Sequence, residues 1–217
     1  MSALEDDRTA ALRGTAGPAL LLVDVQHDFA APEQLSAWGV SPEDIAAVDA
    51  AVDRCADLVA GARAAGVPIV WIELAYDPTR PWRSSAWLTT GSPDSPTDGF
   101  PCVAGSPGAE WWRLEPGDGE PRVQKRFYSG FAETGLAAVL SDLDVGWVTI
   151  AGLTTECCIL ATAFDAVQHD LPVVVVDDAT AAYTPELHRG ALESLALNVA
   201  DIRPTREVVA LWQETTR

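Results

Sequence analysis

Two neighbouring cysteines, Cys157 and Cys158, stand at the expected start of a helix in GLTTECCILATAFDA (152–166). A cysteine in the first turn of a helix lies at the positive end of the helix dipole, which lowers the pKa of the thiol and favours the nucleophilic thiolate. If Thr155 is near the N-cap, both cysteines fall in that turn, with side chains about 100° apart around the helix axis. One of them can be a nucleophile, and spacing alone does not choose which.

An acid and an amine end two other expected strands. Asp24 follows the apolar run at 19–23, and Lys125 ends a short strand at 122–125. Lys125 is the only lysine beside 13 arginines, which suggests a place where a compact, titratable ammonium is needed. Ligands of an open parallel sheet bind outside the carboxyl ends of its strands. We therefore expect the acid, the amine and the thiol to meet at one rim.

The elements that must position these groups alternate between strand and helix. Ser41 is the expected N-cap of the first long helix, and Gly66 is expected to end it. The alternation predicts the α/β class, as a three-layer, doubly wound, Rossmann-like fold with a mostly parallel six-stranded sheet. The expected strands are 19–23, 67–74, 122–125, 147–151, 173–177 and 200–203, and the expected helices are 42–65, 133–142, 156–169, 185–197 and one from 204 or 205.

Length and composition predict one globular domain over residues 1–217, with a flexible N-terminus at 1–15. A net charge of −18 disfavours nucleic acid and anionic membranes as partners. The chain shows neither a signal-like opening nor a long apolar run, so we expect a soluble, cytoplasmic protein. Its four cysteines have no framework spacing, which favours free thiols over disulfides.

One segment, 77–119, does not fit the alternation. It is rich in Pro, Gly, Ser and Asp, and a loop of this length in a compact domain is usually functional or disordered. Its aromatic content favours order. A lid over the site, a contact with another subunit and simple packing on its own domain all remain open for its four tryptophans, Trp82, Trp87, Trp111 and Trp112.

Four separated segments together resemble the isochorismatase-like cysteine hydrolases, the superfamily of nicotinamidases, N-carbamoylsarcosine amidases, and biuret and ureidoacrylate hydrolases. The first and second are LLVDVQHDF (21–29) and VQKRFYSGFAETGL (123–136). The third and fourth are AGLTTECCILATAFDA (151–166) and VVVVDDATAAY (173–183). They occur in the order that the superfamily shows, which makes the resemblance specific.

The resemblance implies a triad and a reaction. Its register places the nucleophile at Cys158 and makes Cys157 a buried neighbour. Asp24 would take the thiol proton and return it to the leaving amine, while Lys125 would hold the pair and depress the thiol pKa. A cis peptide between Leu153 and Thr154 would aim the backbone N–H groups of Thr154 and Cys158 at an oxyanion. The implied reaction is cleavage of a small amide, carbamoyl or ureide C–N bond through a thioester.

Substrate and cofactor are less defined by the sequence. Gln26 is a candidate for substrate contact near the site, and aromatic pocket walls are expected from Phe29, Tyr128 and Phe131. Nicotinamidases carry a metal-binding Asp and two His after the second strand, but this chain has no histidine between 28 and 168. We therefore expect no metal and no cofactor, and nicotinamide is disfavoured. A substrate carboxylate would need a cation, for which the candidates are Arg80, Arg83 and Arg126.

Three other functions remain open. Vinyl-ether hydrolases of the superfamily work by acid catalysis, so isochorismatase activity with Asp24 as the acid is the alternative enzyme. A noncatalytic binding module on the same fold is a second alternative, and a redox role of the adjacent cysteines is a third. Relatives commonly form oligomers, which makes a homodimer or homotetramer the expected assembly.

Overall fold

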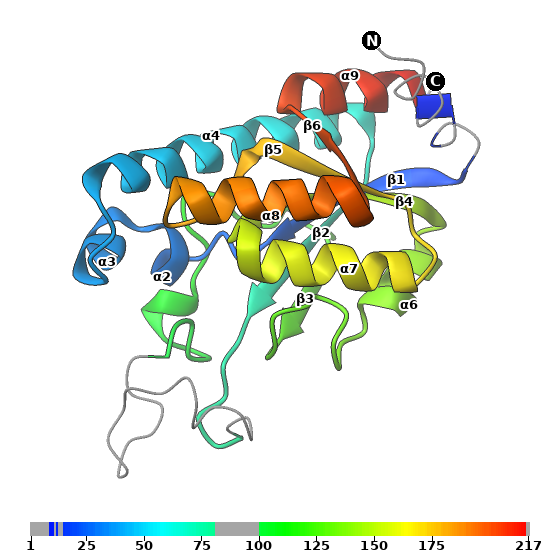
Figure 1. Ribbon diagram of the computed structural model, residues 1–217. Coiled ribbons are helices and arrows are strands. Elements are labelled where there is room, and N and C mark those ends of the chain that lie inside the picture. The colour runs from blue at the N-terminus through cyan, green and yellow to red at the C-terminus, as the bar shows by residue number, and fades with distance from the viewer. Residues whose placement is uncertain (1–8, 11, 13–14, 81–99, 216–217) are drawn as a thin grey trace.

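The computed structural model describes residues 9–10, 12, 15–80 and 100–215 (Figure 1). Its centre is a six-stranded sheet in the order β3-β2-β1-β4-β5-β6, in which every neighbouring pair is parallel. The predicted α/β class and parallel sheet are confirmed. The strands are β1 (Gly17–Val23), β2 (Ile69–Leu74), β3 (Arg122–Lys125), β4 (Val145–Leu153), β5 (Val173–Ala181) and β6 (Ala200–Arg203).

Helices cover both faces of the sheet. They are α2 (His27–Ala30), α3 (Pro32–Ala37), α4 (Pro42–Ala65), α6 (Leu136–Asp142), α7 (Leu160–Gln168), α8 (Pro185–Asn198) and α9 (Thr205–Thr215), with short turns η1 (Pro107–Ala109) and η2 (Thr155–Ile159). Figure 1 shows α4 and α9 on one side of the sheet and α6, α7 and α8 on the other. The short helices α2 and α3 were not expected from the sequence.

The strand β1 shows why its sequence is a continuous apolar run. Leu20 and Leu22 belong to the core under α4 and α9, whereas Leu21 and Val23 belong to the core under α6, α7 and α8. Successive side chains of a strand point to opposite faces, so a strand with helices on both faces needs apolar residues at every position.

The longest helix, α4, begins and ends where the sequence predicts. Ser41 is its N-cap and accepts a hydrogen bond from the Asp44 backbone N–H at 3.1 Å. Gly66 ends it with a φ of +70°, in the left-handed region that favours glycine. The following strand starts at Ile69 rather than at 67, after Pro68, which has no N–H to donate to a neighbouring strand.

The described part of the segment 77–119 packs back on its own domain. Trp111 donates from Nε1 to Glu73 Oε2 at 2.9 Å and lies edge-on to Trp71, with ring centroids 4.8 Å apart. The Trp112 backbone N–H donates to Val25 O at 2.9 Å. These two tryptophans therefore attach the segment to the sheet. Trp82 and Trp87 lie outside the described residues, as does most of the expected flexible N-terminus.

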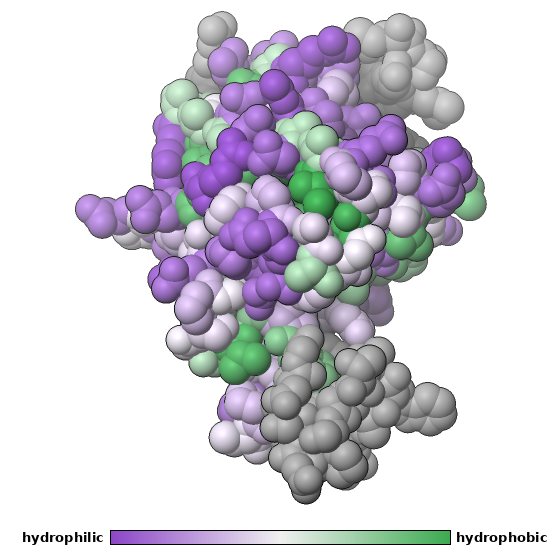
Figure 2. All heavy atoms as spheres, turned by 90° about the vertical axis from the view of Figure 1, so that its left-hand side faces the viewer, coloured by the Kyte–Doolittle hydropathy of each residue, from purple (hydrophilic) through white to green (hydrophobic). Residues whose placement is uncertain are grey.

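Figure 2 shows that the face on the left of Figure 1 is dominated by hydrophilic residues, with hydrophobic residues in small separate groups. The large apolar side chains that are exposed include Leu197 on α8. Within the described ranges, no helix has both the length and the hydropathy that crossing a bilayer requires.

Gly152 of β4 packs tightly against Val23 of β1, which leads to a testable prediction. Its φ is +115°, and an added Cβ would lie 2.0 Å from the carbonyl oxygen of Val23. Gly152→Ala should therefore lower the free energy of unfolding by more than about 3 kcal/mol in urea denaturation. The matched control is Gly190→Ala in α8, where an added Cβ meets nothing within 4 Å. That change should raise stability by up to about 1 kcal/mol, and equally small effects at both positions would contradict the close strand contact.

Candidate active site

The predicted acid, amine and thiol meet at the carboxyl ends of β1, β3 and β4. Lys125 Nζ lies 2.8 Å from Asp24 Oδ2 and donates to Cys158 Sγ at 3.3 Å. It also donates to the Phe127 carbonyl oxygen at 3.0 Å. The side chains of Asp24 and Lys125 are fully buried. The ammonium therefore joins the carboxylate to the sulfur in a site shielded from water.

The sheet topology explains why three distant residues meet. The strand order reverses between β1 and β4, and ligands of doubly wound folds bind at such a point. Asp24 follows β1 with a φ of +50°, and its backbone N–H donates to Ile72 O of β2 at 2.8 Å. Leu74 of β2 pairs with Lys125 of β3, which places the amine on the same rim.

The segment that carries the thiol differs from an ordinary helix start. The peptide bond between Leu153 and Thr154 is cis, as the resemblance implies. The next five residues form the π-helical turn η2, in which the Ile159 N–H donates to Thr154 O at 3.2 Å. Thr154, rather than Thr155, is the N-cap residue. Thr155 instead hydrogen-bonds His188 Nδ1 at 2.8 Å, which ties this turn to α8.

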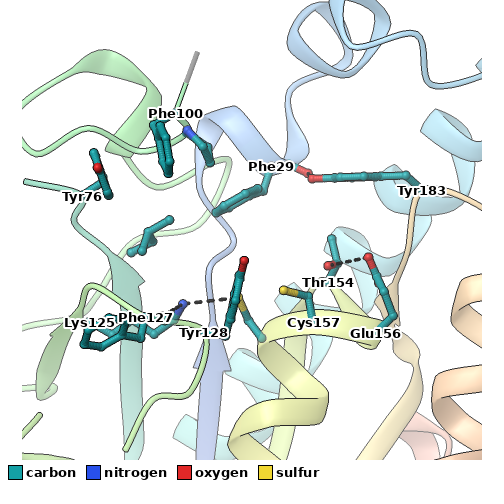
Figure 3. Close-up of a pocket in the computed structure, with 13 residues that line it drawn as sticks. Phe29, Tyr76, Phe100, Lys125, Phe127, Tyr128, Thr154, Glu156, Cys157 and Tyr183 are labelled. Carbon is teal, nitrogen blue, oxygen red and sulfur yellow. Dashed lines mark hydrogen bonds between the residues drawn. The ribbon is translucent and has the colours of Figure 1, made fainter. Parts of the chain in front are cut away.

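A cavity of about 320 Å³ opens over the thiol (Figure 3). Phe29 and Tyr128 line it, in agreement with the expected aromatic walls. The backbone segment that carries the expected oxyanion donors, Thr154 and Cys158, also lines it. Its complete lining is Phe29, Leu74, Tyr76, Phe100, Pro101, Lys125, Phe127, Tyr128, Thr154, Glu156, Cys157, Cys158 and Tyr183.

Two expected substrate-binding residues do not line this cavity. Gln26 is fully buried, and its amide donates to the carbonyl oxygens of Leu74 and Ala109 at 2.9 and 2.8 Å. Its Oε1 accepts from the Leu74 N–H at 2.8 Å, so Gln26 joins β1, β2 and the turn η1. Phe131 lies in the core, and its ring stacks on His169 with centroids 4.7 Å apart. Both side chains hold the fold around the site.

Cys157 is not the buried neighbour that the resemblance implies. It is half-buried, its side chain lines the cavity, and Figure 3 shows its sulfur pointing into the open space beside Tyr128. Cys158 also lines the cavity but is only 6% exposed. Both sulfurs therefore border the same space, and only Cys158 contacts Lys125 through a hydrogen bond.

Charge and burial set the protonation of the site. The hydrogen bond between the two thiols, burial and the Asp24 carboxylate raise the pKa of Cys158 well above its usual value, and Lys125 opposes them. The expected depression of this pKa is wrong. Burial also raises the pKa of Asp24, against the opposing charge of Lys125. For Lys125, burial lowers the pKa, but the charges of Asp24 and Cys158 outweigh it and the pKa is raised. Asp24 and Cys158 therefore both hold a proton more readily than exposed groups of their kind, beside the ammonium of Lys125.

Several lining residues were missed from the sequence. Tyr183 follows β5, on the rim where ligands are expected, and donates from its hydroxyl to the Phe29 carbonyl oxygen at 3.2 Å. Glu156 lies inside the motif that carries the thiol. The rule that ligands bind at the carboxyl ends of parallel strands could have indicated Tyr183. The motif around the cysteines could have indicated Glu156. Tyr76 and Phe100, which stack with centroids 4.4 Å apart, come from the long segment and its start, where no local pattern gives their direction.

The acidic residue of β2, Glu73, is held by hydrogen bonds from other side chains. Glu73 accepts hydrogen bonds from Trp111, Arg122 and Gln124. In the part of the chain that the structure describes, no three His, Cys, Asp or Glu side chains gather as a metal site would require. That the protein binds no metal stays a prediction, which metal analysis of the purified protein can test.

Comparisons with known proteins identify the family and agree with the fold. The ureidoacrylate amidohydrolase RutB of Methylobacterium radiotolerans is 31% identical over 200 residues, which cover 81% of this chain and 72% of that protein. A probable inactive nicotinamidase of Arabidopsis thaliana is 32% identical over 180 residues, covering 78% of this chain and 83% of that protein. The crystal structure of a cysteine hydrolase from Pseudomonas syringae matches with a TM-score of 0.78 and 25% identity, over 91% of this chain and 93% of that one. The isochorismatase domain model matches residues 18–207, and the chain belongs to this family.

Proposed function

We propose that this chain is a cysteine-dependent hydrolase that cleaves a non-peptide C–N bond in a small amide, carbamoyl or ureide substrate. The observation that carries the proposal is the position of Lys125 Nζ, 2.8 Å from Asp24 and 3.3 Å from Cys158, at a small aromatic cavity. Similarity to a ureidoacrylate amidohydrolase supports the choice of bond.

In the first half of the reaction, Cys158 Sγ bonds to the substrate carbonyl carbon while its proton passes to the Asp24 carboxylate. The raised pKa of Asp24 makes it a better proton acceptor than an exposed carboxylate. Lys125 stays charged and stabilises the sulfur as its negative charge develops. The Asp24 proton then passes to the leaving nitrogen, the C–N bond breaks, and a thioester and an amine or ammonia remain.

The carbonyl oxygen becomes negatively charged in the tetrahedral intermediate. The backbone N–H groups of Thr154 and Cys158 are its proposed donors, and each such donor is typically worth about 3 to 4 kcal/mol of transition-state stabilisation. In the second half, Asp24 takes a proton from water as the water oxygen bonds to the thioester carbon. The C–S bond breaks, the proton returns to the Cys158 sulfur, and a carboxylic or carbamic acid leaves.

The size and lining of the cavity favour a small substrate. A volume of about 320 Å³ lies at the lower end of the range for small-molecule sites, and six of the thirteen residues that line it are aromatic. We expect the substrate to lie flat against these rings, with its carbonyl toward the thiol. Assembly into a homodimer or homotetramer remains part of the proposal.

The test is release of ammonia or amine from a panel of small amides, carbamoyl compounds and ureides, with isochorismate included. We expect turnover of at least one C–N substrate and none of isochorismate. Consumption of isochorismate alone would favour acid catalysis by Asp24. Absence of turnover across the panel would favour a noncatalytic relative, a class to which the probable inactive nicotinamidase of Arabidopsis thaliana is assigned by its name.

A further inference from the structure

The cavity contains one charged group that the proposed reaction does not use. Lys125 and Glu156 are the only side chains with a formal charge at neutral pH among the described residues that line it. The charge of Lys125 is compensated by Asp24. Glu156 Oε1 accepts a hydrogen bond from Thr154 Oγ1 at 3.1 Å, whereas Oε2 is buried and has no hydrogen-bond partner within the described ranges.

Within the part of the chain that the structure describes, this carboxylate also has no counter-charge nearby. Among the described residues, no arginine, lysine or histidine forms an ion pair with Glu156. Burial accordingly raises the pKa of its carboxyl. Tyr183, which lies close to it in Figure 3, donates its hydroxyl proton to the Phe29 carbonyl oxygen instead. A buried carboxylate oxygen without a hydrogen-bond partner is costly, and a bound ligand can supply the missing donor.

The remaining wall of the cavity suits a cation. Six aromatic side chains line it, namely Phe29, Tyr76, Phe100, Phe127, Tyr128 and Tyr183. The face of an aromatic ring attracts an ammonium group, and a group of such rings with a carboxylate is a common arrangement for binding one. Phe127 already has one cation on its ring, with Arg126 Cζ 4.6 Å from the centroid.

An anionic substrate finds no matching group among the described residues that line the cavity. The arginines considered for a substrate carboxylate do not line the described cavity: Arg126 lies over Phe127 beside Glu133, and Arg80 is exposed on the chain after β2. Arg83 lies outside the described residues. A substrate carboxylate would meet the uncompensated charge of Glu156 and pay for its own desolvation.

We infer that Glu156 is a substrate-specificity residue and that the substrate carries an ammonium or similar cationic group, bound by Glu156 and the aromatic wall while Cys158 attacks the amide. The inference rests on the proposed function and defines its substrate class. Glu156 lies two residues before the nucleophile on the same turn, so both ends of the substrate are held by η2.

Three amides of similar length test this inference. At neutral pH β-alaninamide ends in an ammonium group, butyramide in a methyl group of the same size, and succinamate in a carboxylate. We expect the wild-type kcat/KM for β-alaninamide to exceed that for butyramide by about 10- to 100-fold, the range that a hydrogen bond to a charged group provides. Succinamate should be the poorest of the three. A preference for succinamate, or no preference, would overturn the inference.

The variant Glu156→Gln isolates the charge. It should lower kcat/KM for β-alaninamide by about 10- to 100-fold, mainly through KM, and change butyramide less than about threefold. The matched control is Glu186→Gln, which removes one negative charge from an exposed residue in the first turn of α8 outside the cavity. An equal loss for all three amides in Glu156→Gln would show a structural role and contradict the inference.

A binding measurement separates failure of the inference from failure of the proposed function. With Cys158→Ala protein, ligand-observed NMR compares the affinities of β-alaninamide and butyramide without turnover. One outcome is that no amide is hydrolysed, that β-alaninamide binds more tightly than butyramide, and that the double variant Cys158→Ala with Glu156→Gln loses this difference. The proposed reaction is then wrong and the cation site stands. If amides are hydrolysed but β-alaninamide has no advantage in rate or binding, the cation site is wrong and the reaction stands.

Discussion

Replacing Cys158 by serine is expected to lower kcat by at least about 10³-fold, whereas Cys157→Ser should retain activity within about tenfold. Both sulfurs border the cavity, but only Cys158 accepts a hydrogen bond from Lys125, at 3.3 Å. A serine hydroxyl is a much weaker nucleophile than a thiol at neutral pH, since its proton is harder to remove. Within the described residues, the sulfur of Cys157 hydrogen-bonds Cys158 but forms no hydrogen bond with Asp24 or Lys125.

The measurement is steady-state kinetics of both variants on the best amide from the panel, with thermal unfolding of each as a check of folding. Because the two cysteines are adjacent and each variant loses one sulfur, each is a control for the other. Loss of activity in Cys157→Ser alone would identify Cys157 as the nucleophile. Equal activity of both variants and the wild type would exclude a covalent mechanism.

Lys125→Met is expected to abolish turnover and also to lower the free energy of unfolding by about 3 to 5 kcal/mol, because it leaves the Asp24 carboxylate buried without its partner. The side chains of both residues are fully buried, and their charged atoms are 2.8 Å apart. Lys125→Arg should not restore activity, since a planar guanidinium cannot replace a compact ammonium among three close acceptors.

The double variant Asp24→Asn with Lys125→Met separates stability from catalysis. With both charges removed, urea denaturation should show that much of the lost stability returns, because neither group is left as an unpaired buried charge. Activity should remain absent, because no group is left to take the thiol proton. Recovery of activity along with stability would mean that the pair is structural, and additive losses of stability would contradict the ion pair.

The sheet and its helices were predictable because their signals are local. Strands with helices on both faces need continuous apolar runs, as in β1, and such runs are visible in the sequence. The limits of α4 follow from a serine cap and a glycine, both of which act within one turn. The meeting of Asp24, Lys125 and Cys158 follows from the rule that ligand sites lie at the carboxyl ends of parallel strands.

What the sequence did not predict depends on the direction of single side chains. The π-helical turn η2 closes its hydrogen bond over five residues instead of four, which turns neighbouring side chains through a smaller angle than in an α-helix. Cys157 and Cys158 can therefore both face the cavity, although an α-helical spacing predicts that one points away. Gln26 was expected near the substrate, but its amide satisfies buried backbone groups of β2 and η1 that are far away in sequence.

The covalent intermediate is the most direct test of the proposed function. Wild-type protein would be mixed with the best amide, quenched in acid within the first turnovers, and digested for mass spectrometry of the peptide that contains both cysteines. We expect the mass of the acyl group on Cys158, with fragment ions that exclude Cys157, and no adduct on the Cys158→Ser protein under the same conditions. The substrate should be one whose acyl-enzyme forms rapidly and is hydrolysed slowly, so that the intermediate accumulates. Turnover of such a substrate without any acyl adduct on this peptide would contradict the thioester mechanism.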